Sequence, residues 1–182
     1  YVEYNDYHIM EVMRMKVIET ERLYLRELVL EDKDKLAKVL SDVYSMKFYP
    51  HPFSEEEVKN WIIWNIDNYK KYNHGLWAVI LKEGNIFLGD CGITMQNIEG
   101  EVVPEMGFHI IKDYCGKGYA TEAALACKKY AFEELNYSRL FSYTILENIP
   151  SQKVANKVGM SLYKYFEKNN LRQIAQVVNK DN

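Results

Sequence analysis

Hydrophobic and polar residues alternate over residues 22–28, which is the pattern of a β-strand with one buried face. From Glu31 the hydrophobic residues recur every three or four positions instead, which predicts a helix. The apolar positions of this helix are Leu36, Val39, Leu40 and Val43. Ser54 and Glu57 have the spacing of a capping box, so a second helix is expected to begin there and to end near Gly75.

The middle of the chain predicts three strands followed by a long helix. The strands are expected at residues 76–82, 86–95 and 102–111, with turns at 83–85 and at Gly100. Because they follow one another closely, we expect an antiparallel meander. The helix is predicted by a stripe of small and apolar residues at helical spacing, which are Ala120, Ala124, Cys127, Ala131 and Leu135.

The end of the chain predicts three more strands and one short helix. The strands are expected at 139–145, 161–166 and 173–178, and the helix at 151–158. Gly159 is expected to end that helix in a left-handed conformation. The last two strands flank a turn at Asn169 and Asn170.

This order of elements indicates a mixed α/β (α+β) fold in one domain. The segment from strand 102–111 through the long helix to strand 139–145 is long enough to connect two parallel neighbours. No repeat or Pro/Gly-rich linker interrupts residues 15–182, which we therefore expect to form the domain. Regular patterning starts at Met15, so residues 1–14 are interpreted as an N-terminal extension.

Composition excludes several classes of protein. The 182 residues are 48% hydrophobic and 27% charged, which is the balance of a folded protein. A net charge of −3 argues against nucleic acid as the main partner, and no apolar run approaches the roughly 20 residues of a membrane span. Three cysteines without a CxxC pair argue against a disulfide framework or a metal site and favour the cytoplasm.

Two glycines at the head of the long helix are the clearest candidate for a ligand site. Gly116 and Gly118 allow unusual backbone dihedrals, and the first amides of a helix lack intrahelical partners, so the segment can bind an anion. Lys117 adds a charge and Thr121 a hydroxyl. A plain tight turn is the alternative. Neither a Walker A motif nor a dinucleotide fingerprint is present, which leaves a diphosphate ligand other than ATP or NAD as the specific option.

Residues 114–123 resemble the acetyl-CoA-binding motif of the GNAT N-acetyltransferases, in the variant of the RimJ/RimL-type ribosomal-protein N-terminal acetylases. Residues 19–26, 104–110 and 148–160 resemble three further segments of that branch, in the same order. The sequence departs from the branch at Asp113, Asn156 and Met160, and Ala155 stands where many members have a proton-donating tyrosine.

The resemblance implies a three-layer fold: a twisted mixed sheet of six to seven strands with helices on both faces. Its parallel strands 4 and 5, here 102–111 and 139–145, splay apart, and we expect a bulge at Gly107 to start the divergence. Backbone atoms of Phe108, Ile110 and Lys112 would then bind the pantetheine of acetyl-CoA. The residues expected to hold its pyrophosphate are Cys115, Gly116, Lys117, Gly118, Tyr119, Ala120 and Thr121.

The implied activity is transfer of an acetyl group from acetyl-CoA to a primary amine of a small molecule or a protein N-terminus, by direct attack in a ternary complex. An alkyl ammonium has a pKa near ~10 and needs a base. Glu105 is the candidate base, with a solvated strand carboxylate as the alternative, and His109 is the reserve. Ser151 is the candidate acid and Asn148 a candidate cofactor contact, although both residue types also cap helices.

Several alternatives stay open at this point. Cys115 near a helix start could have a lowered thiol pKa and form an acetyl-enzyme, which direct transfer makes unnecessary. The aromatic side chains that either line the acceptor cleft or belong to the core are His51, Phe53, Trp61 and Trp64. A non-catalytic acyl-CoA-binding module and a nucleotide-phosphate protein are the competing functions, and the protein could be a monomer or a homodimer.

Overall fold

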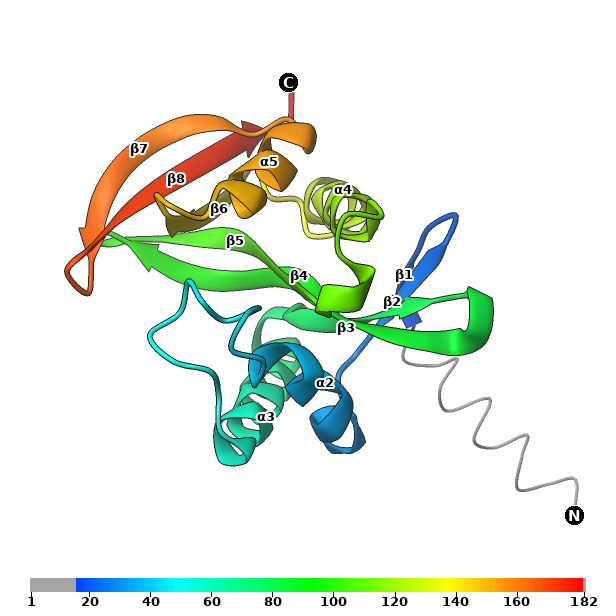
Figure 1. The fold of residues 1–182 in the computed structure, drawn as a ribbon. Helices are drawn as coiled ribbons and strands as arrows, with labels where there is room; N and C mark the ends of the chain where they lie inside the picture. The colour runs from blue at the N-terminus through cyan, green and yellow to red at the C-terminus, as the bar shows by residue number, and fades with distance from the viewer. Residues whose placement is uncertain (1–15, 182) are drawn as a thin grey trace, which may run out of the picture.

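The structure is a computed structural model that describes residues 16–181, so the interpretation of residues 1–14 lies outside the described part. One eight-stranded sheet has the order β1-β2-β3-β4-β5-β6-β8-β7 (Figure 1). The strands are β1 (Lys16–Glu19), β2 (Leu23–Arg26), β3 (Leu76–Leu81), β4 (Ile86–Ile98), β5 (Glu101–Ile110), β6 (Arg139–Ile145), β7 (Ser161–Lys168) and β8 (Leu171–Asn179). The helices are α2 (Lys33–Leu40), α3 (Glu55–Tyr72), α4 (Tyr119–Glu133) and α5 (Ile149–Lys157), with 3-10 turns η1 (Leu30–Asp32), η2 (Glu83–Asn85) and η3 (Lys112–Tyr114).

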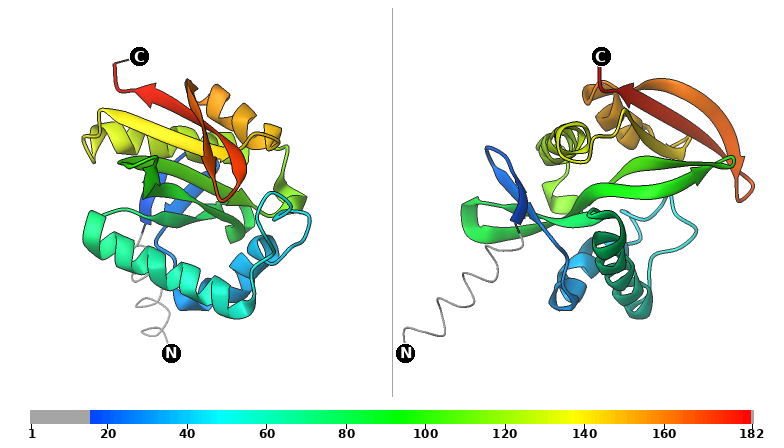
Figure 2. Two further views of the ribbon diagram at one scale, coloured as in Figure 1. Left: turned by 90° about the vertical axis from the view of Figure 1, so that its left-hand side faces the viewer. Right: turned by 180° about the vertical axis from the view of Figure 1, so that it is seen from behind.

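The helices form a layer on each face of the sheet, as predicted. Figures 1 and 2 show α4 and α5 on one face and α2 and α3 on the other. Each pair covers its own hydrophobic core, with Cys127 and Ala131 of α4 in one and Leu36 and Ile62 in the other. The sheet has eight strands where six to seven are expected. β1 is only four residues long, which is too short for a pattern of alternation to be read.

The antiparallel meander of β3, β4 and β5 is confirmed, but the bulge expected at Gly107 is wrong. The register between β4 and β5 runs without a shift, and Gly107 pairs directly with Gly92. The irregularity lies between β3 and β4, beside Gly89. Gly89 has a φ of 143°, and a Cβ there would lie 1.9 Å from the carbonyl oxygen of His109. Close packing of two backbones therefore requires glycine at residue 89.

The parallel strands β5 and β6 separate, as the resemblance implies. Their register consists of a single pair, Glu105 with Phe141, although each strand continues for several residues on either side. β6 pairs along its whole length with β8 on its other edge. Beyond Glu105, the β5 backbone groups that point toward β6 therefore face a gap in the sheet, while those on the other edge pair with β4.

Two helices end earlier than the hydrophobic spacing indicates. α2 ends at Leu40, and Val43, expected on its apolar face, is 73% exposed. The reason is local: the Asp42 carboxylate accepts hydrogen bonds from the amide (2.8 Å) and hydroxyl (2.7 Å) of Ser45, which favours a turn. α4 ends at Glu133, so Leu135 packs on the core from outside the helix.

The turn-and-cap predictions agree better with the structure. Ser54 Oγ accepts from the Glu57 amide (3.2 Å) and Glu57 Oε2 accepts from the Ser54 amide (2.7 Å), which is the predicted capping box. α3 ends at Asn73 in a left-handed conformation, two residues before Gly75. Gly159 has a φ of 92°, as expected after a helix.

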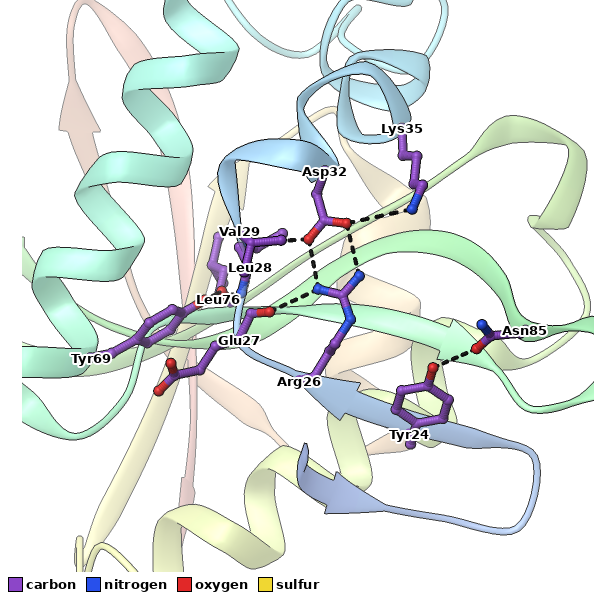
Figure 3. A network of polar contacts seen from close by, with 10 residues as sticks. All are labelled: Tyr24, Arg26, Glu27, Leu28, Val29, Asp32, Lys35, Tyr69, Leu76 and Asn85. Atoms are coloured by element: carbon purple, nitrogen blue, oxygen red, sulfur yellow. Dashed lines mark hydrogen bonds and ion pairs between the residues drawn. The ribbon is translucent and has the colours of Figure 1, made fainter. Parts of the chain in front are cut away.

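A buried polar network joins β2 to the helical layer (Figure 3). The Arg26 guanidinium donates to both carboxylate oxygens of Asp32, at 2.6 and 2.8 Å. The Tyr69 hydroxyl accepts from the Leu28 amide (3.1 Å) and donates to the Leu76 carbonyl. These bonds fix β2 and α3 relative to β3. Within residues 16–181 we find no helix with the length and apolarity to cross a membrane.

Candidate active site

The segment between η3 and α4 has the backbone conformation that its glycines allow. Gly116 and Gly118 have φ values of 77° and 85°, both left-handed. Gly118 is the N-cap of α4, so no side chain bonds the first amides of the helix. A Cβ on Gly116 would meet no atom within 4 Å. The segment therefore presents free amides to an open space, which suits an anion.

The turn between β1 and β2 supports this segment, a contact that the sequence did not indicate. Arg22 donates to the Lys117 carbonyl (3.1 Å) and to the Glu122 carboxylate (2.6 Å), and its guanidinium lies over the Tyr119 ring. Thr20 also donates to Glu122 (2.6 Å). The first turn of α4 is thus held by the β1–β2 turn.

A cavity of about 1110 Å³ extends from this segment along the separated strands to the β7–β8 turn. Of the residues expected to bind the cofactor, those that line it are Phe108, Ile110, Lys112, Cys115, Gly116, Gly118, Tyr119, Ala120, Thr121, Asn148 and Ser151. Lys117 does not line it, and its ammonium lies over the Tyr114 ring. The two candidate bases, Glu105 and His109, lie in the same cavity.

Glu105 sits at the point where β5 and β6 separate. Its side chain faces the gap, and the backbone N–H of Tyr143 on β6 donates to its Oε1 (3.4 Å). The residue is only 8% exposed. Burial raises the pKa of Glu105 to about 7, and the Tyr143 amide and the charges of His109 and Lys168 offset only part of that effect. A carboxyl group in this state can exchange a proton near neutral pH.

His109 is held on both sides of its ring. Nδ1 lies 2.7 Å from the buried Asp90 carboxylate, and Nε2 lies 2.6 Å from the Tyr49 hydroxyl. Burial alone would lower the pKa of His109, but the Asp90 carboxylate outweighs burial and raises it. Trp61 Nε1 donates to the second oxygen of Asp90 (2.9 Å). Sequence reasoning did not identify Asp90 or Tyr49 as partners of His109. The Asp90 contact depends on the register of β4 and β5, and the Tyr49 contact depends on the path of the loop between α2 and α3.

Asn148 and Ser151 form the start of α5. Asn148 is its N-cap: Oδ1 accepts from the Ser151 amide (3.3 Å), and Nδ2 donates to the Thr144 hydroxyl (3.0 Å). The capping alternative therefore holds for Asn148. Within the described residues the Ser151 hydroxyl has no protein partner, and Ser151 lines the cavity. Ala155 is buried in the core and does not reach the cavity.

The three cysteines are free thiols. The expectation of a lowered pKa for Cys115 is wrong: partial burial raises it, and Sγ lies 3.5 Å from the Ile110 carbonyl. Cys115 precedes the N-cap Gly118 by three residues, so the helix amides do not stabilise a thiolate there. Cys127 lies in the core, with its Sγ 3.6 Å from that of Cys91. In the described part of the chain, no group of three or more His, Cys, Asp or Glu could hold a metal.

The aromatic candidates divide between cleft and core. Trp61 and Trp64 line the cavity. Phe53 packs in the core below α3, with its ring 5.6 Å from that of Trp61. His51 is exposed and pairs with Glu57 (2.8 Å).

Comparison with known proteins agrees with this geometry. The family described as an acetyltransferase (GNAT) domain matches residues 22–161. Two Bacillus subtilis proteins are similar to the chain. The uncharacterized N-acetyltransferase YnaD is 35% identical, and the match covers 83% of this chain and 86% of YnaD. The uncharacterized protein YkkB is 34% identical, and the match covers 82% of this chain and 87% of YkkB. The solved structure of a GNAT-family acetyltransferase from Bacillus anthracis has a TM-score of 0.77 and 31% identity, covering 91% of this chain and 99% of that one.

Proposed function

Because the chain belongs to the GNAT acetyltransferase family and is thus an acetyl-CoA-dependent enzyme, we propose that its acceptor is a primary amine of a small molecule or a protein N-terminus. The acceptor attacks directly while both substrates are bound, without an acetyl-enzyme. The raised pKa of the Cys115 thiol is consistent with this route. We also propose kinship with the RimJ/RimL branch, on its four sequence motifs, and a cytoplasmic location, on the three free cysteines.

The residues present fit coenzyme A. Gly116 leaves open space, the α4 amides have no side-chain cap, and the β5 edge that faces β6 lacks a strand partner beyond Glu105. We assign the pyrophosphate to the amides at 115–120 and to Thr121, and the pantetheine amides to the β5 backbone around Phe108 and Ile110. Acetyl-CoA supplies an acetyl group activated as a thioester.

The observation that carries the proposal is that one cavity contains both the glycine segment and a buried carboxylate of raised pKa. In its charged form Glu105 attracts an alkyl ammonium and removes its proton. A carboxylate with a pKa of about 7 is a stronger base than an exposed one, so it suits an amine whose own pKa is near ~10.

The other candidate residues have supporting roles in this proposal. Ser151, with a hydroxyl open to the cavity, can donate a proton to the departing thiolate, and Asn148 fixes the turn that positions it. His109 stays the reserve base. Because both of its nitrogens are engaged, it would first have to release Tyr49.

The test is an acetyl-CoA consumption assay with a panel of amines and N-terminal peptides, comparing the wild type with Glu105→Gln from pH 6 to 9. The wild-type kcat/KM should rise through pH about 7 as Glu105 ionises. The variant should lose this rise, and kcat should fall about 100-fold or more.

Glu101→Gln is the matched control, because Glu101 is also on β5 but pairs with Arg139 outside the cavity. An unaltered pH profile in Glu105→Gln would remove Glu105 as the base. Coenzyme A binding without turnover of any amine would favour the non-catalytic module.

A further inference from the structure

We propose that the acceptor amine also carries a carboxylate, and that Lys168 binds this carboxylate while Glu105 receives the amine. The inference rests on the proposed function and narrows its acceptor to a small zwitterion such as an amino acid. The charges, contacts and position of Lys168 support it in turn.

The charge of the cavity does not suit a polycation. Its lysines are Lys47, Lys112, Lys153, Lys157 and Lys168. Among the described residues that line it, Glu105 is the acidic one, and the nearby Asp90 is already paired with His109 and Trp61. A polyamine would therefore meet one carboxylate and several ammonium groups. A molecule with one positive and one negative group matches this cavity better.

The position of Lys168 separates it from the proposed coenzyme site. Lys112 lies in η3, directly before the glycine segment, and Lys153 and Lys157 lie in α5. Lys168 is the last residue of β7 and pairs with Leu171 across the two-residue turn. Figures 1 and 2 show this turn beside the loop that joins α2 to α3, away from the start of α4.

Lys168 is held in place but lacks a carboxylate partner. Its ammonium donates to the Tyr143 hydroxyl (2.7 Å), and the described residues offer it no acidic group within ion-pair distance. Two other cations of this part of the sheet have carboxylate partners: Lys164 pairs with Glu99 and Arg139 with Glu101, both at 2.7 Å. The Asn169–Asn170 turn after Lys168 is left-handed at both residues, with φ of 54° and 60°, which suits a tight hairpin.

Tyr143 sets the spacing between the two charged groups. Its hydroxyl accepts from Lys168, and its backbone amide donates to Glu105 (3.4 Å). The ammonium of Lys168 and the carboxylate of Glu105 are thus no farther apart than the length of this tyrosine plus its two hydrogen bonds. One small molecule can therefore bridge them, with several bonds between its amine and its carboxylate.

Gln173 offers a further hydrogen bond at this end of the cavity. It is 6% exposed and lines the cavity, and no side-chain hydrogen bond found in residues 16–181 involves its amide. The polar atoms of this amide are accessible from the cavity, so they can form a hydrogen bond with an acceptor bound there. The Gln173 amide can donate to the second oxygen of a carboxylate bound by Lys168.

The experiment compares straight-chain ω-amino acids, from glycine to 6-aminohexanoate, with their carboxamides. Rates are compared at equal concentrations of neutral amine and saturating acetyl-CoA. We expect kcat/KM for the best amino acid to exceed that for its carboxamide by about tenfold or more. Lys168→Met should abolish this preference by raising KM, with kcat nearly retained.

The matched control is Lys164→Met, four residues earlier on β7 and outside the cavity, which should keep the preference. Equal wild-type rates for both series, or a preference that survives in Lys168→Met, would overturn the inference. An equal fall in kcat/KM for the amino acids and for their carboxamides in Lys168→Met would overturn the inference too. Lys168 would then act on Glu105 and not on the acceptor.

Calorimetric titration separates this inference from the proposed function. Wild-type protein that binds coenzyme A but none of the amino acids would contradict the inference and leave the proposed function standing. Protein that binds the amino acids through Lys168 but does not bind coenzyme A would overturn the proposed function and leave Lys168 as a carboxylate-binding residue only.

Discussion

Glu105 shows how a single side chain can acquire its chemistry from its surroundings. It lies on a strand between Met106 and Pro104, in a segment whose alternation identifies which residues share a face. Its protonation behaviour depends on the separation of β5 from β6, which buries the carboxyl group and leaves it the Tyr143 amide (3.4 Å) as its backbone partner. The same burial that makes it a useful base should make it unfavourable for stability once it is charged.

The stability of the protein should therefore fall as Glu105 ionises. Burial raises the pKa of Glu105 to about 7 from an ordinary 4.5, so the folded state holds its proton more tightly than the unfolded state. This favourable contribution is complete below pH 4.5 and is lost as the pH rises through 7. Relative to wild type, Glu105→Gln should gain up to about 3 kcal/mol in the free energy of unfolding between pH 5 and pH 8.

Denaturant unfolding at the two pH values checks this prediction. The exposed Glu31→Gln serves as the control, and its difference from wild type should be the same at both. If the difference in free energy of unfolding between Glu105→Gln and wild type does not change with pH, burial does not raise the pKa of the Glu105 carboxyl group.

Sequence reasoning at this scale finds residues by type and position, but not their partners. Glu105 and His109 follow from strand parity and motif position. Asp90 becomes visible only when β4 and β5 are aligned, because it stands opposite His109 in the register. The prediction of a lowered thiol pKa for Cys115 is wrong because a position close to a helix start in the sequence does not place the thiol against the helix amides.

At the scale of elements, the contact between β2 and the helical layer depends on the buried Arg26–Asp32 pair (Figure 3). Both side chains are withdrawn from water, so each charge needs the other. Arg26→Met should lower the free energy of unfolding by about 3–5 kcal/mol, because it leaves the buried Asp32 charge with only the longer contact to Lys35 (3.8 Å) and the Val29 amide.

Arg139→Met is the comparison for this prediction. It removes an ion pair with Glu101 in which both side chains are 43% exposed, and such pairs contribute about 1 kcal/mol or less. Chemical denaturation of both variants measures the contrast. Equal losses would show that burial does not strengthen the dependence on the Arg26–Asp32 pair.

Periodicity predicts most elements correctly and their ends less well. The meander, the long helix and the capping box at Ser54 follow from patterns within one element. The end of α2 does not, since hydrogen bonds from Ser45 to Asp42 override the helical spacing that includes Val43. The missing bulge at Gly107 has a similar cause, because close packing elsewhere places the irregularity at Gly89.

At the scale of the whole molecule, the site exists because three distant segments meet at one gap in the sheet. The glycine segment before α4, the separated strands β5 and β6, and the β7–β8 turn line a single cavity. The resemblance to a family predicts the first two. It does not predict the β7–β8 turn or Lys168, because that contact depends on how the final hairpin packs beside Tyr143.

Gly116 allows the most direct test that this cavity holds coenzyme A. Gly116 and Gly100 are both left-handed, with φ of 77° and 92°, and a Cβ at either would meet nothing within 4 Å. Tryptophan at either position should therefore lower the free energy of unfolding by a similar amount, roughly 1–2 kcal/mol, through backbone strain. Gly116 lies at the cavity and Gly100 lies in the β4–β5 turn outside it.

The decisive measurement is calorimetric titration of coenzyme A into Gly116→Trp and Gly100→Trp, with thermal unfolding to show that both variants fold. Binding should be lost or weakened at least about 100-fold in Gly116→Trp and unchanged in Gly100→Trp, because only the first side chain occupies the space in front of the α4 amides. Wild-type affinity in a folded Gly116→Trp variant would contradict the assignment of this segment as the coenzyme A site.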